Sequence, residues 1–272
     1  MSSIDEIVAA VLDSRRYRSV HPATVRRLAI AQLDAAGGRP AEAIKRTKRA
    51  LHQIFGAYLP SPPRYARLLG ELEAAASPDE QQQVLRRAMA QHASTRERLD
   101  HLDAFYDALR GRIGTPGSVV DVACGLGPLA APWLGLLPGS VYHAWDIDVA
   151  LVQFVGRCLE HLGLSPRAST VDLLDMPQWP RTDLALVLKT LPCLEQQCPG
   201  ASEALLDSID APCLVVSFPT RSLSGRAKGM GATYARRFEA LLQAREWIAE
   251  SFEVGPELVY VVHRPTVVGE PA

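Results

Sequence analysis

Hydrophobic residues in the first part of the chain recur with the spacing of α-helices. Apolar positions return every three or four residues over 3–17, from Pro22 to the Gly37-Gly38 pair, and over 41–58. This spacing predicts three amphipathic helices. Proline-containing breaks follow at 60–63 and 77–79, and one or two further helices are expected over 80–111. We therefore expect an N-terminal helical domain, with its connecting helices, over residues 1–112.

The second part of the chain alternates short apolar runs with helical patterns. Strands are predicted at 117–121, 140–145, 167–171, 183–188 and 212–217, and helices from 128, at 149–162, at 201–209 and at about 232–248. Alternation of this kind gives a parallel sheet covered on both faces. Gly255-Pro256 turns the chain between 251–254 and 257–262. The sequence thus predicts an α/β domain over 113–272 whose mostly parallel, seven-stranded sheet ends in an antiparallel hairpin.

Three acidic residues stand at the ends of successive predicted strands. Asp121 opens the glycine loop Asp121-Val-Ala-Cys-Gly-Leu-Gly127, Asp146 follows 25 residues later, and Asp172 follows 26 residues after that. The carboxyl ends of parallel strands meet at one edge of the sheet, where a glycine turn and a helix N-terminus bind nucleotides. An acid after the second strand can accept from ribose hydroxyls, and one after the third from an adenine amine. The alternative is that aspartate merely suits turns and helix caps.

The glycine loop also separates the candidate cofactors. Dinucleotide enzymes carry Gly-x-Gly-x-x-Gly, whereas this chain has Ala130 at the third position and Pro128 within the loop. S-adenosylmethionine, a nucleoside without a pyrophosphate, suits this loop better than NAD. Together with the antiparallel hairpin, the loop favours a Rossmann-like class I methyltransferase over a dehydrogenase.

Composition places the chain among ordinary soluble globular proteins. Of its 272 residues, 47% are hydrophobic and 22% are charged, and no apolar run approaches the length of a membrane span. Early acids and the lack of a signal-peptide pattern lead us to expect a cytoplasmic protein. The five cysteines lack metal-ligand spacing, so we expect reduced, mostly structural thiols and no metal site.

Positive charge is concentrated near the N-terminus. Residues 15–67 contain 12 basic residues but only two acidic ones, Asp34 and Glu42. Such an excess is typical of proteins that bind a phosphate backbone, although a solvated basic face without a partner is the alternative. The candidate RNA-binding residues of this region are Arg15, Arg16, Arg18, Arg26, Arg27, Lys45, Arg46, Lys48, Arg49, Arg64 and Arg67.

Two loops after predicted strands carry further candidate residues. Lys189-Thr-Leu-Pro192 follows the fourth strand, where a methyltransferase positions the acceptor of its methyl group. The segment 217–230 follows the fifth strand and combines one aromatic residue with three cations, Phe218, Arg221, Arg226 and Lys228. This composition suits stacking and phosphate contact with RNA, although it also fits an ordinary surface loop.

Several motifs, taken together and in this order, resemble one family. They are Tyr17-Arg18, Thr24-Val-Arg-Arg27, Arg49-Ala-Leu-His52 to Gly56-Ala-Tyr58, His92-Ala-Ser-Thr-Arg-Glu-Arg98, Asp121-Val-Ala-Cys-Gly125, Lys189-Thr-Leu-Pro192 and Ser217-Phe-Pro-Thr-Arg-Ser-Leu223 with Gly225-Arg-Ala-Lys-Gly-Met230. The chain resembles the aminoglycoside-resistance 16S rRNA methyltransferases that modify N7 of guanine 1405. The resemblance implies an N-terminal domain that docks on the small ribosomal subunit and a Rossmann-like domain that holds S-adenosylmethionine.

The resemblance also implies roles for individual residues. Arg98, which by pattern alone is either a surface residue or a fork for a carboxylate, is placed on the methionine carboxylate. The remaining cofactor-binding set is Ala123 and Gly125 beside the methionine, Asp146 on the ribose, Asp172 with Leu173 at the adenine, and His92, Ile147 and Lys189. Gly127 departs from the family, which commonly has Asn there, and we expect this change to affect loop stiffness more than chemistry.

The implied reaction needs little acid or base catalysis. N7 of guanine has an in-plane lone pair and no proton to lose, so we expect no general base. Lys189, Pro192 and Phe218 are expected to position the extruded guanine, with Phe218 stacking on it. The expected partner is 16S rRNA within the 30S subunit, bound by a monomer without an obligate protein partner. Two alternatives are methylation of N1 of adenine or guanine, and a ribosome-binding factor without activity.

Overall fold

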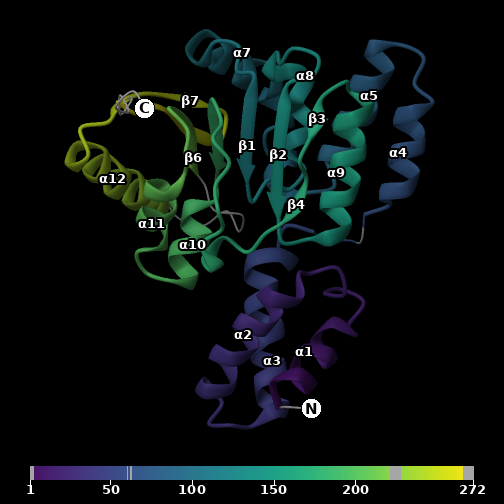
Figure 1. The fold of residues 1–272 in the computed structure, drawn as a ribbon, viewed down its shortest axis with the longest axis vertical. Helices are drawn as coiled ribbons and strands as arrows, with labels where there is room; N and C mark the ends of the chain where they lie inside the picture. Colours follow the sequence, from purple (N-terminus) through teal and green to yellow (C-terminus); the bar gives the residue numbers. More distant parts are fainter. Residues whose placement is uncertain (1–2, 60, 62, 221–227, 266–272) are drawn as a thin grey trace, which may run out of the picture.

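The N-terminal residues form a separate helical body. The computed structural model describes residues 3–59, 61, 63–220 and 228–265. Helices α1 (Ser3–Leu12), α2 (Pro22–Ala35) and α3 (Pro40–Leu51), followed by a π-helical turn (His52–Gly56), enclose a hydrophobic core of their own. Figure 1 shows this body extending from one end of the sheet. The first helix is shorter than predicted, because residues 13–19 turn to bring Val20 into a bridge with Asp148.

Residues 65–113 pack on the sheet rather than on the N-terminal body. They form α4 (Tyr65–Glu73), α5 (Pro78–Met89), α6 (Ala93–Arg96), a 3₁₀ turn (Leu99–His101) and α7 (Leu102–Ile113). Ser77 caps the N-terminus of α5, because its hydroxyl oxygen accepts a hydrogen bond from the amide of Glu80. Pattern analysis missed α4, whose apolar stripe is Leu68, Leu69 and Leu72. The predicted boundary at 112 therefore marks the start of the sheet, whereas the hydrophobic cores divide near residue 60.

The sheet has the predicted mixed topology. Its strands are β1 (Ser118–Val122), β2 (Val141–Asp146), β3 (Ser165–Pro166), β4 (Ser169–Thr170), β5 (Leu184–Leu188), β6 (Cys213–Pro219), β7 (Ile248–Val254) and β8 (Glu257–His263). The order is β3-β2-β1-β5-β6-β8-β7, with β4 also paired to β2. Strands β7 and β8 form the antiparallel hairpin. Of the third predicted strand, 167–171, only β4 forms, and the short β3 precedes it and ends at Pro166, which lacks a backbone donor.

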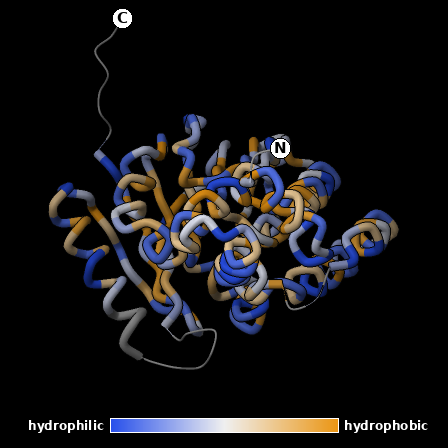
Figure 2. Tube along the Cα trace, turned by 90° about the horizontal axis from the view of Figure 1, so that it is seen from below, coloured by the Kyte–Doolittle hydropathy of each residue, from blue (hydrophilic) through white to orange (hydrophobic). Residues whose placement is uncertain are grey.

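Helices cover both faces of the sheet. One face packs against α4, α5, α7, α8 (Ala131–Leu134) and α9 (Val149–His161), and the other against α10 (Leu191–Gln197), α11 (Ala201–Ser208) and α12 (Lys228–Ala244). The helix expected from residue 128 is a 3₁₀ turn (Gly127–Ala130) followed by the short α8. In the hydropathy colouring, orange segments gather in the interior and blue ones along the outer helices (Figure 2). None of the helices in the described ranges is long and apolar enough to cross a membrane.

The N-terminal body is joined directly to the carboxyl edge of the sheet. The amide of His21 donates to the carbonyl of Ile147 at 2.7 Å, and the amide of Val149 donates to the carbonyl of Ser19 at 2.8 Å. These bonds lie at the end of β2, immediately after Asp146. The body and the strand ends thus form the two sides of one site.

Candidate functional site

A pocket with an open volume of about 860 Å³ lies between the N-terminal body and the carboxyl ends of the strands. Of the residues predicted to bind a cofactor, it brings together His92, Ala123, Asp146, Ile147, Asp172, Leu173 and Lys189. Arg98 and Gly125 lie next to this lining without being part of it. The N-terminal body adds a wall that includes Thr24, Arg27 and Tyr58, which the cofactor prediction did not contain.

The loop after β1 is held in a conformation that side chains rarely adopt. Ala123 and Gly125 have φ angles of 50° and 51°, and Lys189 at the end of neighbouring β5 has 58°. The amide of Gly125 donates to Oδ2 of Asp146 at 2.9 Å, which fixes the loop against β2. Left-handed conformations at non-glycine residues cost about 1 to 3 kcal/mol each and gather at functional sites. The strain at Ala123 and Lys189 marks this edge as such a site.

Of the three strand-end acids, two line the pocket. Burial raises the pKa of Asp146 to about 6, and its Oδ1 accepts from the amide of Asp148 at 3.1 Å. Asp172 caps the turn that follows it by accepting from the amide of Leu174. Asp121 instead lies beneath the loop, where Tyr142 donates to it at 2.9 Å and burial raises its pKa to about 8. A Cβ on Gly127 would lie 3.1 Å from Oδ2 of Asp121, so the family's Asn would adjoin this buried acid.

His92 fills the space above Gly125. Its ring stacks on Tyr58 with centroids 5.5 Å apart, and a Cβ on Gly125 would lie 2.9 Å from its Cε1. Burial lowers the pKa of His92 to about 4, so the imidazole is neutral at physiological pH. Its Nδ1 is buried and has no hydrogen-bond partner among the residues that the structure describes. A buried polar atom of this kind at a pocket wall is suited to a polar group of a ligand.

Gly125→Ala tests this packing. The new Cβ would strain the backbone by about 1 to 3 kcal/mol and displace His92. We expect a lower melting temperature and weaker binding of S-adenosylhomocysteine, both measurable by calorimetry. The matched control is Gly139→Ala: Gly139 has a φ of 82°, but a Cβ added there would lie more than 4 Å from every other atom of the described residues that could clash with it. Equal effects of the two changes on ligand affinity would show that the His92 contact is irrelevant to the site.

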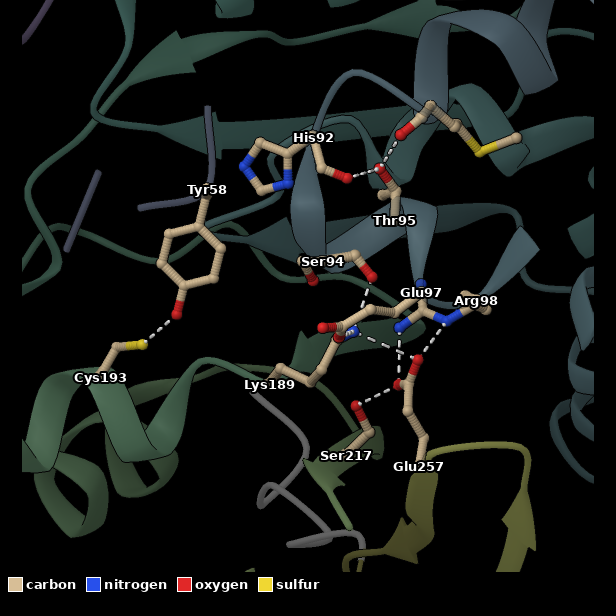
Figure 3. A network of polar contacts seen from close by, with 11 residues as sticks. Tyr58, His92, Ser94, Thr95, Glu97, Arg98, Lys189, Cys193, Ser217 and Glu257 are labelled. Carbon is tan, nitrogen blue, oxygen red and sulfur yellow. Dashed lines mark hydrogen bonds and ion pairs between the residues drawn. The ribbon is translucent and has the colours of Figure 1, made fainter. Parts of the chain in front are cut away.

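A buried charge network lies behind the pocket (Figure 3). Glu257, at the start of β8, accepts from Nε and Nη2 of Arg98 at 2.9 and 2.8 Å and from the Ser217 hydroxyl at 3.0 Å. Nζ of Lys189 lies 3.5 Å from the same carboxylate and donates to the carbonyl of Ser94 at 2.6 Å. Burial would raise the pKa of Glu257, but the charges of Arg98 and Lys189 hold it below its ordinary value. Burial lowers the pKa of Lys189, and Glu257 opposes that shift.

The network changes the view of Arg98. The sequence predicted that its guanidinium either faces solvent or binds the cofactor. In the structure Arg98 is only 4% exposed, and its guanidinium donates two hydrogen bonds to Glu257. The surface alternative is therefore wrong, and the contact with a methionine carboxylate stays a prediction. Glu257 was missed altogether. The available signal was a lone acid that opens the otherwise apolar run 258–262.

The structure gives no support to Phe218 as a stacking partner for a base. The side chain is 2% exposed and packs against Phe238 and Tyr260, with ring centroids 5.5 and 6.0 Å away. It belongs to the core between the sheet and α12, and the predicted role is corrected to packing. Pro192 is the second residue of α10 and does not line the pocket.

The predicted RNA-binding residues mostly lie on the surface of the N-terminal part. The exposed ones are Arg15, Arg16, Arg18, Arg26, Lys45, Arg49, Arg64 and Arg67, while Arg46 and Lys48 are half-buried. Arg27 differs, because its guanidinium enters the pocket and pairs with Asp172. Arg221 and Arg226 fall outside the described residues, and Lys228 begins α12.

The similarity of the chain to known proteins identifies its family. Residues 13–261 match the family model described as ribosomal RNA methyltransferase (FmrO). The chain belongs to this family. The resemblance and the fold class predicted from the sequence are thereby confirmed.

Individual relatives cover nearly the whole of this FmrO-family chain. It is 48% identical over 265 residues to a 16S rRNA (guanine(1405)-N(7))-methyltransferase of Micromonospora echinospora, covering 96% of this chain and 97% of that one. A protein of the same name from Serratia marcescens is 36% identical, with 96% and 99% covered. Among solved structures, the 16S rRNA methyltransferase RmtF in complex with S-adenosyl-L-homocysteine superposes with a TM-score of 0.85 at 34% identity, covering 97% and 99%.

Proposed function

We propose that this protein transfers the methyl group of S-adenosylmethionine to N7 of guanine 1405 in 16S rRNA, acting as a monomer on the 30S subunit and conferring aminoglycoside resistance. Family membership and full-length similarity to enzymes of that name support the target. The observation that carries the proposal is the pocket at the carboxyl edge, which has one acid at the end of β2 and a second after β4.

The pocket residues suit an adenosine with a methionine tail. Asp146 is assigned to the ribose hydroxyls and Asp172 to the adenine amine, because carboxylates accept strongly from such donors. Ile147 and Leu173 offer apolar contacts to the base. The Ala123–Gly125 backbone, with the unpartnered Nδ1 of His92 nearby, is assigned to the methionine portion.

The chemistry rests on positioning. When bound, S-adenosylmethionine supplies an electrophilic methyl group on a positively charged sulfur. The lone pair of N7 would form the new bond as the sulfur–methyl bond breaks, with the bonding electron pair staying on sulfur. Neutral S-adenosylhomocysteine would leave, the guanine would carry the positive charge, and no proton would move. The enzyme must therefore align N7 and exclude water, and alignment of this kind can lower a reaction barrier by about 7 to 11 kcal/mol. Lys189 is held in place for this task by Ser94, Glu97 and Glu257.

Docking on rRNA is assigned to the basic N-terminal body. Its exposed arginines and lysines suit contacts with phosphates, which release counterions condensed on the RNA, so affinity is expected to fall as the salt concentration rises. A folded subunit presents these phosphates in a fixed arrangement. We therefore assign the 30S subunit, rather than free 16S rRNA, as the substrate.

The substrate assignment is tested by methyl transfer from labelled S-adenosylmethionine to purified 30S subunits, 70S ribosomes and protein-free 16S rRNA. We expect label on 30S subunits and at most traces on free rRNA. Expression in a susceptible bacterium should raise the inhibitory concentration of aminoglycosides that bind near guanine 1405. Equal labelling of free rRNA would contradict the 30S assignment, and no label on any substrate would contradict the activity itself.

A further inference from the structure

An arginine of the N-terminal body closes the adenine end of the pocket. Arg27 lies on α2, yet its Nε donates to Oδ2 of Asp172 at 2.9 Å and its Nη2 donates to Oδ1 at 3.3 Å. Pattern analysis assigned Arg27 to RNA, together with its neighbour Arg26. The structure separates the two, because Arg26 is half exposed and pairs with Asp5 inside the N-terminal body.

The Arg27 guanidinium is held from two sides. Nη2 also donates to Oε1 of Gln197 at 3.2 Å, and the amide nitrogen of Gln197 donates to the carbonyl of Cys193 at 3.1 Å. The side chain of Asp172 is 4% exposed and that of Arg27 is 27% exposed. A bidentate pair with a buried carboxylate is stronger and more directional than a surface ion pair.

Counting acceptor sites shows how a ligand fits beside this pair. A carboxylate offers about four lone-pair positions. Within the described part of the chain, Oδ1 of Asp172 accepts from the Leu174 amide and from Nη2 of Arg27, while Oδ2 accepts only from Nε of Arg27. One position on Oδ2 is left for an amine donor. Arg27 therefore fixes the direction of the carboxylate without consuming its last acceptor position.

The backbone keeps Arg27 in register with the pocket. The contacts of His21 with Ile147 and of Ser19 with Val149 join the start of α2 to the end of β2. Arg27 lies five residues after the first residue of this helix, Pro22, which is about one and a half turns. The helix is thus anchored one residue after Asp146, and the amide of Val171 donates to the carbonyl of Asp146 at 2.9 Å, which holds Asp172 alongside.

We propose that Arg27 is a positioning residue of the cofactor site: its ion pair with Asp172 orients the carboxylate that receives the adenine amine, so the N-terminal body completes the cofactor pocket. The proposal rests on the function proposed above. It moves Arg27 from the RNA-binding surface to the cofactor site. It also makes the N-terminal body necessary for tight cofactor binding and not only for docking on rRNA.

The test is calorimetric titration of S-adenosylhomocysteine into the full-length protein and its variants. Arg27→Ala removes a charged partner from the acceptor, and we expect affinity to fall about tenfold. Arg27→Lys keeps the charge but not the fork, and should recover part of the loss. Arg26→Ala is the matched control and should bind S-adenosylhomocysteine like the wild type. In steady-state assays, KM for S-adenosylmethionine should rise for Arg27→Ala while kcat on 30S subunits stays within about twofold.

A double-mutant cycle separates positioning from a general loss of structure. Adding Arg27→Ala to Asp172→Asn should cost much less than tenfold, because the two changes remove one shared interaction. Unchanged or tighter binding by Arg27→Ala would overturn the proposal, as would a full tenfold loss in the Asp172→Asn background. Failure of the wild type to bind S-adenosylhomocysteine would instead count against the proposed function.

Discussion

Replacing Glu257 by alanine is expected to lower the free energy of unfolding by about 3 to 5 kcal/mol, because it leaves two buried cations without their shared anion. Glu257 is 1% exposed and contacts both Arg98 and Lys189. The loss corresponds to a fall in melting temperature of roughly 10 °C for a chain of this size. Differential scanning calorimetry at neutral pH measures it.

A glutamate on the neighbouring strand provides the control. Glu250 pairs with Arg112 on the surface, with 65% of its side chain exposed. Glu250→Ala removes the same charge and should cost less than about 1 kcal/mol. If both variants melted within about 2 °C of the wild type, the buried network would not contribute to stability as the structure indicates.

Asp146→Ala is expected to weaken S-adenosylhomocysteine binding by about 100-fold or more, since two hydrogen bonds to a charged acceptor are lost at about 1.5 to 3 kcal/mol each. The change also frees the amide of Gly125, which the carboxylate holds at 2.9 Å. The control is Asp175→Ala, which removes an exposed charge a few residues after Asp172. Calorimetric affinity that changes less than about fivefold in Asp146→Ala would remove this residue from the cofactor site.

The same carboxylate predicts a pH dependence. Burial raises the pKa of Asp146 from 3.8 to about 6 in the free protein. Ionised Asp146 accepts hydrogen bonds better, so affinity for S-adenosylhomocysteine should fall as pH drops through 6. The contribution of Asp146 to folding stability changes in the opposite direction. The folded state binds the proton more tightly than the unfolded state, so this contribution declines as the pH rises from about 4 to 6. Asp146→Asn should remove this group's part of both dependences.

The fold and the two acids that line the pocket could be predicted from the sequence because they depend on local patterns. The apolar runs that end in Asp146 and Asp172 each predict, within one short segment, a strand, its direction and an acid at its end. Glu257 could not be assigned in this way, since its partners Arg98 and Lys189 lie 159 and 68 residues earlier. An acid in an apolar strand signals a buried partner without saying which one.

Arg27 and Phe218 show that the sequence does not tell which side chains face the site. Arg27 was predicted to lie on the surface and turns inward, whereas Phe218 was predicted to be accessible and is buried. Charge excess assigned Arg27 to RNA together with its neighbours, but only the packing of α2 against the strand ends shows which arginine turns inward. The motif around Phe218 suggested an exposed ring, whereas the pairing of β6 with β8 places it under α12. Composition indicates that a segment contributes to a basic or an aromatic surface, but tertiary packing decides which of its residues lie on that surface.

Mapping the methylated base shows which atom of the rRNA receives the methyl group. 30S subunits treated with the enzyme and S-adenosylmethionine are reduced with borohydride and cleaved with aniline, which breaks the chain only at N7-methylguanine. Primer extension then locates the break. We expect one new cleavage at guanine 1405, absent when S-adenosylmethionine is omitted. Incorporated methyl label without aniline cleavage, or with an extension stop that needs no cleavage, would place the methyl on another atom and contradict it.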